Sequence, residues 1–323
     1  MSNLFVGLMS GTSRDSLDGC LVSFNNGLKL ESFKTINFSK GYQSSNDIDF
    51  ISEEITNKSI SLVKELIFSY KKEDIVAIAF PGQTISHSDE FSLQAGSPEN
   101  LTKALDIPVF ADFRNFDIAR GGKGAPLIPE FHKYLLGDNT KNKIVFNIGG
   151  IANGTYLQET SIKLASDVGP GNCLMDSAMR MFRLGSFDKD GGLASKGVIN
   201  NELINSFMAD MQELSYPRAD DISAYIKIIE KHKKQILNQR PADALCTLTE
   251  LTVKKIIEFI DYCDHVDELV FHGGGLENKH LMRRIAESSS IKIKTIDHLA
   301  PSKYIEAIAF AYLAYKKRAV LFK

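Results

Sequence analysis

The chain has 323 residues, of which 43% are hydrophobic and 24% are charged. This length and composition suffice for two ordinary cores, so a single small module and a disordered or fibrous protein are excluded. The formal net charge of -2 provides no long-range field to gather nucleic acid or an anionic membrane surface, and we expect neither partner.

The four cysteines, Cys20, Cys173, Cys246 and Cys263, show neither close pairing nor the spacing of metal ligands. Each lies among apolar neighbours, so we expect four reduced, buried thiols in a cytoplasmic protein. No apolar run approaches the roughly 20 residues of a membrane span, and the first residues enter a strand-like segment without a basic, apolar leader. Secretion and membrane anchoring are therefore not expected.

Apolar runs and turn residues in the first half predict the order strand, strand, strand, helix, strand, helix, strand. The first two strands enclose a turn-rich stretch, which is typical of a strand pair around a polar loop. We expect these seven elements at residues 4–9, 20–24, 28–38, 51–68, 75–80, 98–105 and 107–111.

The second half begins in the same way, with three strands of which the first two are joined by a turn that contains paired glycines. It continues with helices and strands in the same order as the first half, and extra helices are expected between residues 199 and 239. We expect strands at 143–147, 155–158, 162–166, 268–271 and 291–296, and helices at 172–182, 243–263, 279–286 and 302–316.

Alternating strands and helices predict an α/β fold, and the duplicated three-strand start predicts two copies of one fold facing each other across a cleft. The polar, turn-forming stretch 137–142 marks the boundary. We therefore expect one domain at residues 1–138 and another at 139–301, with a C-terminal helix at 302–323 that can pack back on the first domain.

The first candidate for chemistry is the loop that contains Gly11, Thr12, Ser13 and Asp15. Its backbone N–H groups and hydroxyls can hold phosphate oxygens, and the carboxylate of Asp15 can hold Mg²⁺ directly or through water. The loop therefore suits the phosphates of a nucleotide. The same residue types also build ordinary hairpin loops.

A second loop occupies the equivalent place in the second half and contains Asn147, Gly149, Gly150 and Asn153. Paired glycines let a backbone approach a phosphate closely, so two such loops could clasp a triphosphate from both sides. A tight hairpin without any ligand uses the same residues.

A third candidate combines a Gly-Pro-Gly turn with an acidic residue on the following helix. Gly169 and Gly171 precede the helix start, which predicts that its first N–H groups are open to an anion. Asp176 lies among apolar residues, where a carboxylate needs partners or a raised pKa, and either suits a general base for a sugar hydroxyl or a water. Asp176 could instead only stabilise the helix dipole from the first turn.

Three further groups complete the set. Gly273, Gly274 and Gly275, followed by Asn278, could form a flat floor for adenine or ribose, or only a sharp strand-to-helix turn. Glu306 lies in an apolar helical run, where it either faces solvent or turns into a cleft. A last group, Gln83, Thr84 and His87, directly follows a strand, where ligands often bind in α/β folds.

Taken together, these segments resemble the anhydro-N-acetylmuramic acid kinases, and the matches occur in order along nearly the whole chain. They are GLMSGTS at 7–13, PGQTISH at 81–87, ADFR at 111–114, DIA at 117–119, GGKGAP at 121–126, NIGGIAN at 147–153, GPGN at 169–172, DKDG at 188–191, GGG at 273–275 and EAIAF at 306–310.

The resemblance implies a fold similar to hexokinase and actin, and a cytoplasmic homodimer. It implies an enzyme of cell-wall recycling that opens the 1,6-anhydro ring of its sugar with water while ATP phosphorylates the 6-oxygen. It also implies roles for individual residues. The ATP phosphates and Mg²⁺ would be held on one side by Gly11, Thr12, Ser13, Asp15 and Asp18, and on the other by Asn147, Gly149, Gly150, Asn153, Gly169 and Gly171. The adenosine would be bound by Gly273, Gly274, Gly275 and Asn278. The sugar would be bound by Gln83, Thr84, His87, Asp112, Arg114 and Arg120.

Within the same resemblance, Asp176 would take a proton from the attacking water and Glu306 would position sugar or water. Three positions depart from the family's usual residues, with Ser16 in place of Gly, Pro81 in place of His and Val168 in place of Thr. They motivate two alternatives, a non-catalytic sensor of sugar or nucleotide and a kinase of another amino sugar.

Overall fold

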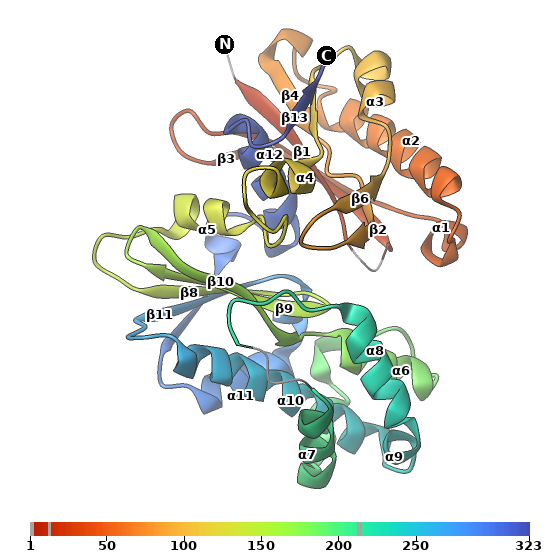
Figure 1. Ribbon diagram of the computed structural model, residues 1–323, viewed down its shortest axis with the longest axis vertical. Coiled ribbons are helices and arrows are strands. Elements are labelled where there is room, and N and C mark those ends of the chain that lie inside the picture. Colours follow the sequence, from red (N-terminus) through yellow and green to blue (C-terminus); the bar gives the residue numbers. More distant parts are fainter. Residues whose placement is uncertain (1–2, 12–13, 212–214) are drawn as a thin grey trace. The chain divides into compact units, whose positions relative to one another are not determined.

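A computed structural model describes residues 3–11, 14–211 and 215–323 of the chain (Figure 1). It contains two compact units, residues 1–131 with 303–323 and residues 132–302. Each unit has its own β-sheet and its own hydrophobic core. The predicted α/β class is therefore confirmed.

The first unit is built on a six-stranded sheet with the order β13-β7-β4-β1-β2-β3. The pairs β1–β2, β2–β3 and β7–β13 are antiparallel, and the pairs β1–β4 and β4–β7 are parallel. A separate hairpin is formed by β5 and β6. The strands are β1 (Leu4–Ser10), β2 (Ser16–Ser23), β3 (Lys29–Asn37), β4 (Ile75–Ala79), β5 (Gln83–His87), β6 (Ser92–Ala95), β7 (Val109–Ala111) and β13 (Val320–Phe322).

Helices cover both faces of this sheet. Neighbouring positions of a strand point to opposite faces, so side chains of the same strand pair contact different helices. Gly19 faces α2, where an added methyl would meet Leu62, whereas Gly7 faces α12, where it would meet the backbone of Ala307. The helices are α1 (Lys40–Ser44), α2 (Ile48–Leu66), η1 (Lys72–Asp74), α3 (Pro98–Leu105), α4 (Phe113–Ile118) and α12 (Ile305–Tyr315), while α5 (Pro129–Leu136) and η6 (Ser302–Tyr304) span the chain boundaries between the units.

The second unit has a five-stranded sheet with the order β10-β9-β8-β11-β12, in which β8, β9 and β10 are antiparallel neighbours and β8, β11 and β12 run parallel. Its strands are β8 (Lys143–Ile148), β9 (Ile151–Gln158), β10 (Ser161–Pro170), β11 (Glu268–His272) and β12 (Lys292–Thr295). Its helices are α6 (Cys173–Met181), η2 (Lys189–Gly191), η3 (Ala194–Lys196), α7 (Asn201–Asp210), α8 (Ile222–Lys231), α9 (Lys233–Leu237), α10 (Pro241–Tyr262), η4 (Gly274–Glu277), α11 (Lys279–Ser288) and η5 (Ile296–His298).

The two sheets share one topology. The order β3-β2-β1-β4-β7 in the first unit corresponds to β10-β9-β8-β11-β12 in the second, with three antiparallel strands followed by two parallel ones in each. The duplicated three-strand start that the sequence predicts is therefore present.

The sequence prediction omits several short elements and is wrong about the burial of one cysteine. It omits the β5–β6 hairpin, α1, α4, α5 and β13, whose few residues give no clear periodicity. All four cysteines are free, but only three are buried; Cys263 is half-buried because it lies at the exposed end of α10. Among the described residues, no helix is long and apolar enough to cross a bilayer.

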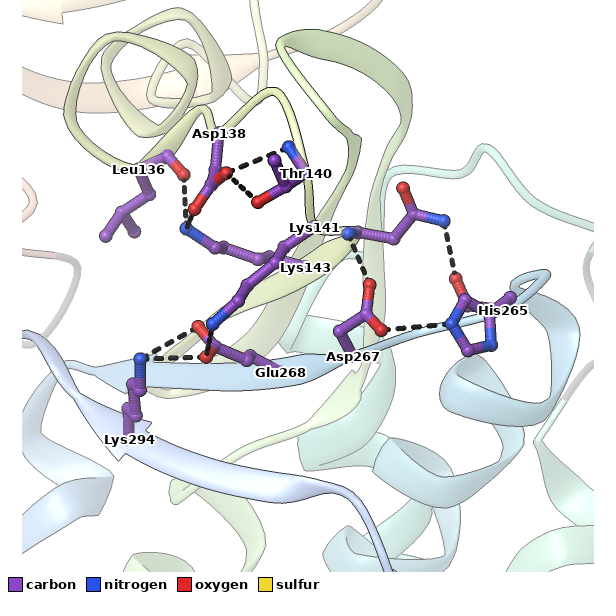
Figure 2. A network of polar contacts seen from close by, with 10 residues as sticks. Leu136, Asp138, Thr140, Lys141, Lys143, His265, Asp267, Glu268 and Lys294 are labelled. Carbon is purple, nitrogen blue, oxygen red and sulfur yellow. Dashed lines mark hydrogen bonds and ion pairs between the residues drawn. The ribbon is translucent and has the colours of Figure 1, made fainter.

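A network of charged groups joins the amino ends of β8 and β11 in the second unit (Figure 2). Glu268, whose side chain is only 4% exposed, accepts hydrogen bonds from Lys141 at 2.7 Å and Lys294 at 2.9 Å. Burial alone would raise the pKa of Glu268, but the two ammonium groups outweigh it and lower the pKa to about 2. The buried carboxylate is thus fully compensated.

We expect Glu268→Gln to lower the free energy of unfolding at pH 7 by about 2 kcal/mol, because two ammonium groups lose their charged partner. The folded-state pKa of about 2 lies below the ordinary value of 4.5, so this stabilisation is present above about pH 4.5 and is lost as the pH falls toward 2. Urea unfolding between pH 3 and 7 measures the difference.

The matched control is Glu230→Gln, which removes an exposed partner of Lys233 and should change the free energy of unfolding by less than about 1 kcal/mol. A difference between wild type and Glu268→Gln that stays constant from pH 7 to pH 3 would contradict the assignment.

Candidate functional site

The loop after β1 is held in place by Gln83, the first residue of β5. The buried Oε1 of Gln83 accepts hydrogen bonds from Ser10 Oγ at 2.7 Å and from Tyr42 OH at 3.2 Å, and its Nε2 donates to the carbonyl of Gly11 at 3.4 Å. The side chain of Gln83 therefore fixes the start of the predicted phosphate loop. Thr12 and Ser13, the centre of that loop, lie outside the described residues.

The two carboxylates that follow the loop differ in environment. Asp15 is exposed, while Asp18 on β2 is partly buried, and burial raises the pKa of Asp18 against the opposing effect of Thr35 and Lys303. Thr35 Oγ1 donates to Asp18 Oδ1 at 2.5 Å, and Lys303 Nζ lies 3.6 Å from the same oxygen. Asp18 thus connects β2 to the residues that precede α12.

Glu306 lies in the first turn of α12 and is partly buried, whereas residues 307–314 after it are all buried. Its position is fixed by the contacts of the preceding residues, since Tyr304 OH lies 3.1 Å from Thr35 Oγ1 and its ring packs on Phe33. The helix that carries Glu306 is therefore tied to β2 and β3.

The predicted sugar-side residues gather around the β5–β6 hairpin and α4. Arg114 donates to the carbonyl of Gly124 at 2.8 Å, and a methyl group added at Gly124 would lie 3.1 Å from the ring of His87. Burial and the nearby charge of Arg114 lower the pKa of His87. We therefore expect His87 to be neutral at pH 7 and to act as a hydrogen-bonding partner.

Asn115 joins the same helix to the hairpin. It exchanges two hydrogen bonds with the backbone of Ser92, at 2.8 and 2.9 Å, and donates to Asp112 Oδ1 at 2.7 Å. Asp112 is partly exposed, and Thr84 lies on β5 with Gln83 and His87. Arg120 lies apart from this group, exposed after the end of α4 and above the ring of Phe116 at 5.3 Å.

In the second unit, the β8–β9 turn and the start of α6 form one hydrogen-bonded corner. The N–H groups of Gly171 and Cys173 donate to the carbonyl of Gly150, and that of Asn172 donates to Gly149, at 2.8–3.1 Å. A methyl group at Gly171 would lie 2.3 Å from the carbonyl oxygen of Gly149. Of the first N–H groups of α6, which were expected to be open to an anion, that of Cys173 is therefore already bonded to the turn.

The paired asparagines of this corner lie opposite each other in the strands, with Asn147 on β8 in register with Asn153 on β9. Asn147 also abuts the glycine run, since a methyl group at Gly273 would lie 2.3 Å from its Oδ1. Gly273 has φ of 90°, a conformation that favours glycine.

The remaining glycines of the run differ in role. A methyl group at Gly275 would lie 2.2 Å from Ile148, so this glycine allows close packing of η4 on β8. Gly274 is exposed with open space around it, as expected of a backbone that a ligand can approach. Asn278 caps α11 by accepting the N–H of Leu281 at 3.0 Å, a structural task that the sequence did not indicate.

Two buried histidines support the strand before the glycine run, and the sequence analysis missed them. The Nε2 atoms of His132 and His272 lie 2.9 Å apart, and His132 Nδ1 lies 2.9 Å from Thr155 Oγ1. Burial lowers the pKa of His272 to about 3 and that of His132 well below its ordinary value, so the pair is neutral. It binds β11 to β9 and α5.

Asp176 occupies a distinctive place in the first turn of α6. Of residues 173–179, all of which the structure describes, it alone is not buried. Its N–H donates to the carbonyl of Asn172 at 2.9 Å, so the helix starts directly at the Gly-Pro-Gly corner. An apolar helix surface thus presents one accessible carboxylate.

Two hollows in the described surface contain none of the predicted site residues. The larger, of about 600 Å³, lies between α2 and α3, and the smaller, of about 450 Å³, is lined mainly by residues at the end of α6 and the start of α10. The described residues also contain no cluster of three or more His, Cys, Asp or Glu side chains that could hold a metal ion.

The family model for anhydro-N-acetylmuramic acid kinase matches residues 3–321 of the chain. The chain belongs to this family. The resemblance that the ordered motifs indicated is therefore confirmed.

Members of the anhydro-N-acetylmuramic acid kinase family are similar to this chain over nearly its full length. The protein of Gamma-proteobacterium EBAC31A08 is 35% identical, with 97% of this chain and 92% of the relative covered. That of Hydrogenovibrio crunogenus is also 35% identical, with 97% and 91% covered.

Two solved structures are similar in fold. Component A of the (R)-2-hydroxyglutaryl-CoA dehydratase of Acidaminococcus fermentans aligns with a TM-score of 0.54 at 13% identity and covers 98% of this chain and 99% of its own. A ROK family glucokinase of Streptomyces griseus aligns with a TM-score of 0.51 at 11% identity, covering 97% and 99%. At these identities the likeness concerns the fold alone.

Proposed function

We propose that this protein is an ATP-dependent kinase that opens 1,6-anhydro-N-acetylmuramic acid with water and phosphorylates its 6-oxygen, in the recycling of cell-wall sugars. The observation that carries the proposal is the family match across residues 3–321, which includes every motif singled out in the sequence. The product is N-acetylmuramic acid 6-phosphate.

The reaction assigns different tasks to the two acidic residues. Asp176 takes a proton from the water that attacks the anomeric carbon, and the bond from that carbon to O6 breaks. The freed O6 takes the γ-phosphoryl group of ATP, and ADP leaves. Glu306 positions the sugar or the water. The partial exposure of both carboxylates within buried helical surroundings supports these roles.

ATP would contact backbone rather than charged side chains. We assign its phosphates to the loop of Gly11, Thr12 and Ser13 and to the corner that contains Gly149 and Gly150. The adenosine is assigned to the glycine run, where Gly274 is exposed and unobstructed.

The oxygen donors near the first loop fit Mg²⁺, which prefers carboxylate and water ligands. Asp15 is exposed; burial is the main cause of the raised pKa of Asp18, and the charge of Asp15 adds to it, so the two carboxylates lie within electrostatic reach of each other. Asp15 would hold the ion, directly or through water, with Asp18 behind it. When bound, Mg²⁺ neutralises charge on the phosphates.

The sugar is assigned to the neighbourhood of His87, Asp112 and Arg114, with Thr84 on the adjoining strand. The hydrogen bonds of Arg114 and Asn115 hold this region in a single arrangement, which supports recognition of a polar ligand. Arg120, exposed beyond α4, is the peripheral member.

We further propose a homodimer in the cytoplasm, as the family resemblance implies. The near-neutral net charge and the absence of a membrane-spanning helix among the described residues are consistent with this location. Light scattering coupled to gel filtration measures the assembly, and a mass near the 35.9 kDa of one chain would exclude the dimer.

The decisive experiment is mass spectrometry of the products formed from ATP, Mg²⁺ and 1,6-anhydro-N-acetylmuramic acid in ¹⁸O-labelled water. We expect N-acetylmuramic acid 6-phosphate with the label on the anomeric oxygen and none in the phosphate ester. Because anomeric oxygens exchange with solvent, unlabelled product incubated for the same time in the same water is the control.

Other outcomes separate the alternatives. Nucleotide binding by calorimetry without turnover of any anhydro-sugar would favour a sensor, and ADP release with a different amino sugar would change the substrate. ATP hydrolysis without sugar at a rate comparable to the kinase rate would contradict the coupling of water attack to phosphorylation.

A further inference from the structure

Strand β10 lies at the edge of its sheet, and residues 216–222 run along that edge where the strand leads into α6. The N–H of Asp167 donates to the carbonyl of Arg218 at 3.0 Å, and the N–H of Arg218 donates to Ser166 Oγ at 2.9 Å. The N–H of Asp220 donates to Asp167 Oδ2 at 2.8 Å. The segment is thus fastened to the last residues of the edge strand, directly before the Gly-Pro-Gly corner.

The edge strand is irregular at this point. Asp167 pairs with Asn153 and Gly169 pairs with Ala152, so Val168 is an extra residue in β10, a bulge. A bulge leaves its extra residue outside the regular ladder and bends the strand. Val168 is fully buried, and its carbonyl accepts a hydrogen bond from Nη2 of Arg218. Without Arg218, the buried carbonyl of Val168 would lose this hydrogen bond, which costs free energy.

The guanidinium of Arg218 is itself held from several sides. Its Nε lies 3.0 Å from Asp220 Oδ1, and both side chains are at most 10% exposed. The group also lies over the ring of Tyr216, 5.1 Å from the centroid. Tyr225 OH donates to Asp220 Oδ2 at 2.5 Å, and Tyr225 belongs to α8, which packs against α6. One cluster therefore connects the bulge to the helix beside α6.

The same segment reaches the β8–β9 turn. A methyl group added at Gly150 would lie 3.1 Å from Cδ1 of Ile222, so the start of α8 lies beside the turn. That turn accepts the N–H groups of Gly171, Asn172 and Cys173, three to five residues after the bulge. The bulge and the turn thus both hold the short segment that leads into α6.

We infer that Arg218 is a positioning residue for the reaction: by holding the bulge at Val168, it sets the direction of β10 into α6 and so the place of Asp176. The inference rests on the role proposed above for Asp176. Arg218 acts through the backbone, and a displacement of the base by about 1 Å can lower the rate by about 10²-fold.

The test compares Arg218→Ala with wild type in the full chain, with ATP and 1,6-anhydro-N-acetylmuramic acid as substrates. We expect kcat to fall by about 10- to 100-fold while both KM values change by less than about threefold, because ligand-contacting groups are retained. Arg218→Lys should remain impaired, since an ammonium lacks the planar fork. Guanidinium ion at millimolar concentration should partly restore kcat in Arg218→Ala.

The matched control is Arg283→Ala, which removes an exposed arginine of α11 and should keep kcat within about twofold of wild type. Should Arg218→Ala not fold, Asp220→Asn keeps the side-chain shape and weakens the ion pair, and kcat should fall by about three- to tenfold. Circular dichroism during heating gives the folded fraction at the assay temperature.

A second readout does not depend on activity. Amide hydrogen exchange followed by mass spectrometry should be faster in residues 169–178 of Arg218→Ala than of wild type, and unchanged there in Arg283→Ala. Unchanged kcat and exchange in folded Arg218→Ala, or a loss of kcat equal to the loss of folded protein, would overturn the inference. An inactive wild type would overturn the proposed function instead, and exchange would still decide whether Arg218 holds α6.

Discussion

Asp176→Asn is expected to lower kcat for the kinase reaction by about 10²- to 10⁴-fold, because an amide cannot take the proton of the attacking water. Asparagine has nearly the same shape, so both KM values should change little. Steady-state ADP release with the anhydro-sugar measures the effect. The size of this loss exceeds that expected for any other single change considered for the site.

The stability of the same variant separates catalysis from a purely structural role. An acidic residue in the first turn stabilises a helix by roughly 0.3–1 kcal/mol. If the role of Asp176 were only structural, Asp176→Asn would lower the free energy of unfolding by that amount and leave kcat intact. Asp261→Asn, an exposed change on α10, is the matched control and should leave both quantities unchanged. Full activity in Asp176→Asn would exclude this residue as the base.

Gly7→Ala is expected to destabilise the first unit by about 3 kcal/mol, the upper range for overpacking. The added methyl group would lie 2.0 Å from the carbonyl oxygen of Ala307 and 3.0 Å from the side chain of Ala311, so α12 must move away from β1. Because Glu306 lies on α12, kcat should fall as well. Urea unfolding and the kinase assay measure the two effects.

The control for this change is Gly41→Ala in α1, where the nearest atom to the added methyl group would lie at an ordinary 3.7 Å. It should be neutral or slightly stabilising, since alanine loses less backbone entropy in a helix than glycine does. Equal stability of Gly7→Ala and wild type would show that α12 does not pack on β1 as described.

The sequence predicted the parts of the fold that have strong periodicity. Val6 and Val145, in the apolar runs of β1 and β8, and Phe259, in the long helix α10, are fully buried, so the apolar patterns of these elements are clear in the sequence. The β5–β6 hairpin escaped prediction because its strands are short and polar, and its position depends on the distant side chain of Asn115.

For the candidate site, the sequence indicated the glycines but could not divide their tasks. Gly171 and Gly275 are needed for close packing on the β8–β9 corner, whereas Gly274 faces open space. Both situations select glycine, so residue type alone cannot separate them. The hydrogen bond from the N–H of Cys173 at the start of α6 could not be predicted either, since its acceptor, Gly150, is distant in the chain.

Arg218 was missed for a related reason. Its neighbours in sequence give no motif, and its importance depends on a bulge that only the register of β9 and β10 reveals. The signal that could have found it is the Gly-rich strand end itself, because an irregular edge strand requires a donor from elsewhere for its extra carbonyl.

The return of the chain to its first sheet has a consequence for biosynthesis. Strand β1 begins at Leu4, yet α12 and β13, which complete the same unit, belong to the last 21 residues, 303–323. The rings of Phe5 and Phe24 pack on the ring of Tyr315 in α12. Until α12 is synthesised, these two rings lack this packing partner. The first unit can therefore close only after residues 303–323 have been synthesised, whereas residues 132–302 can fold during translation as one continuous segment.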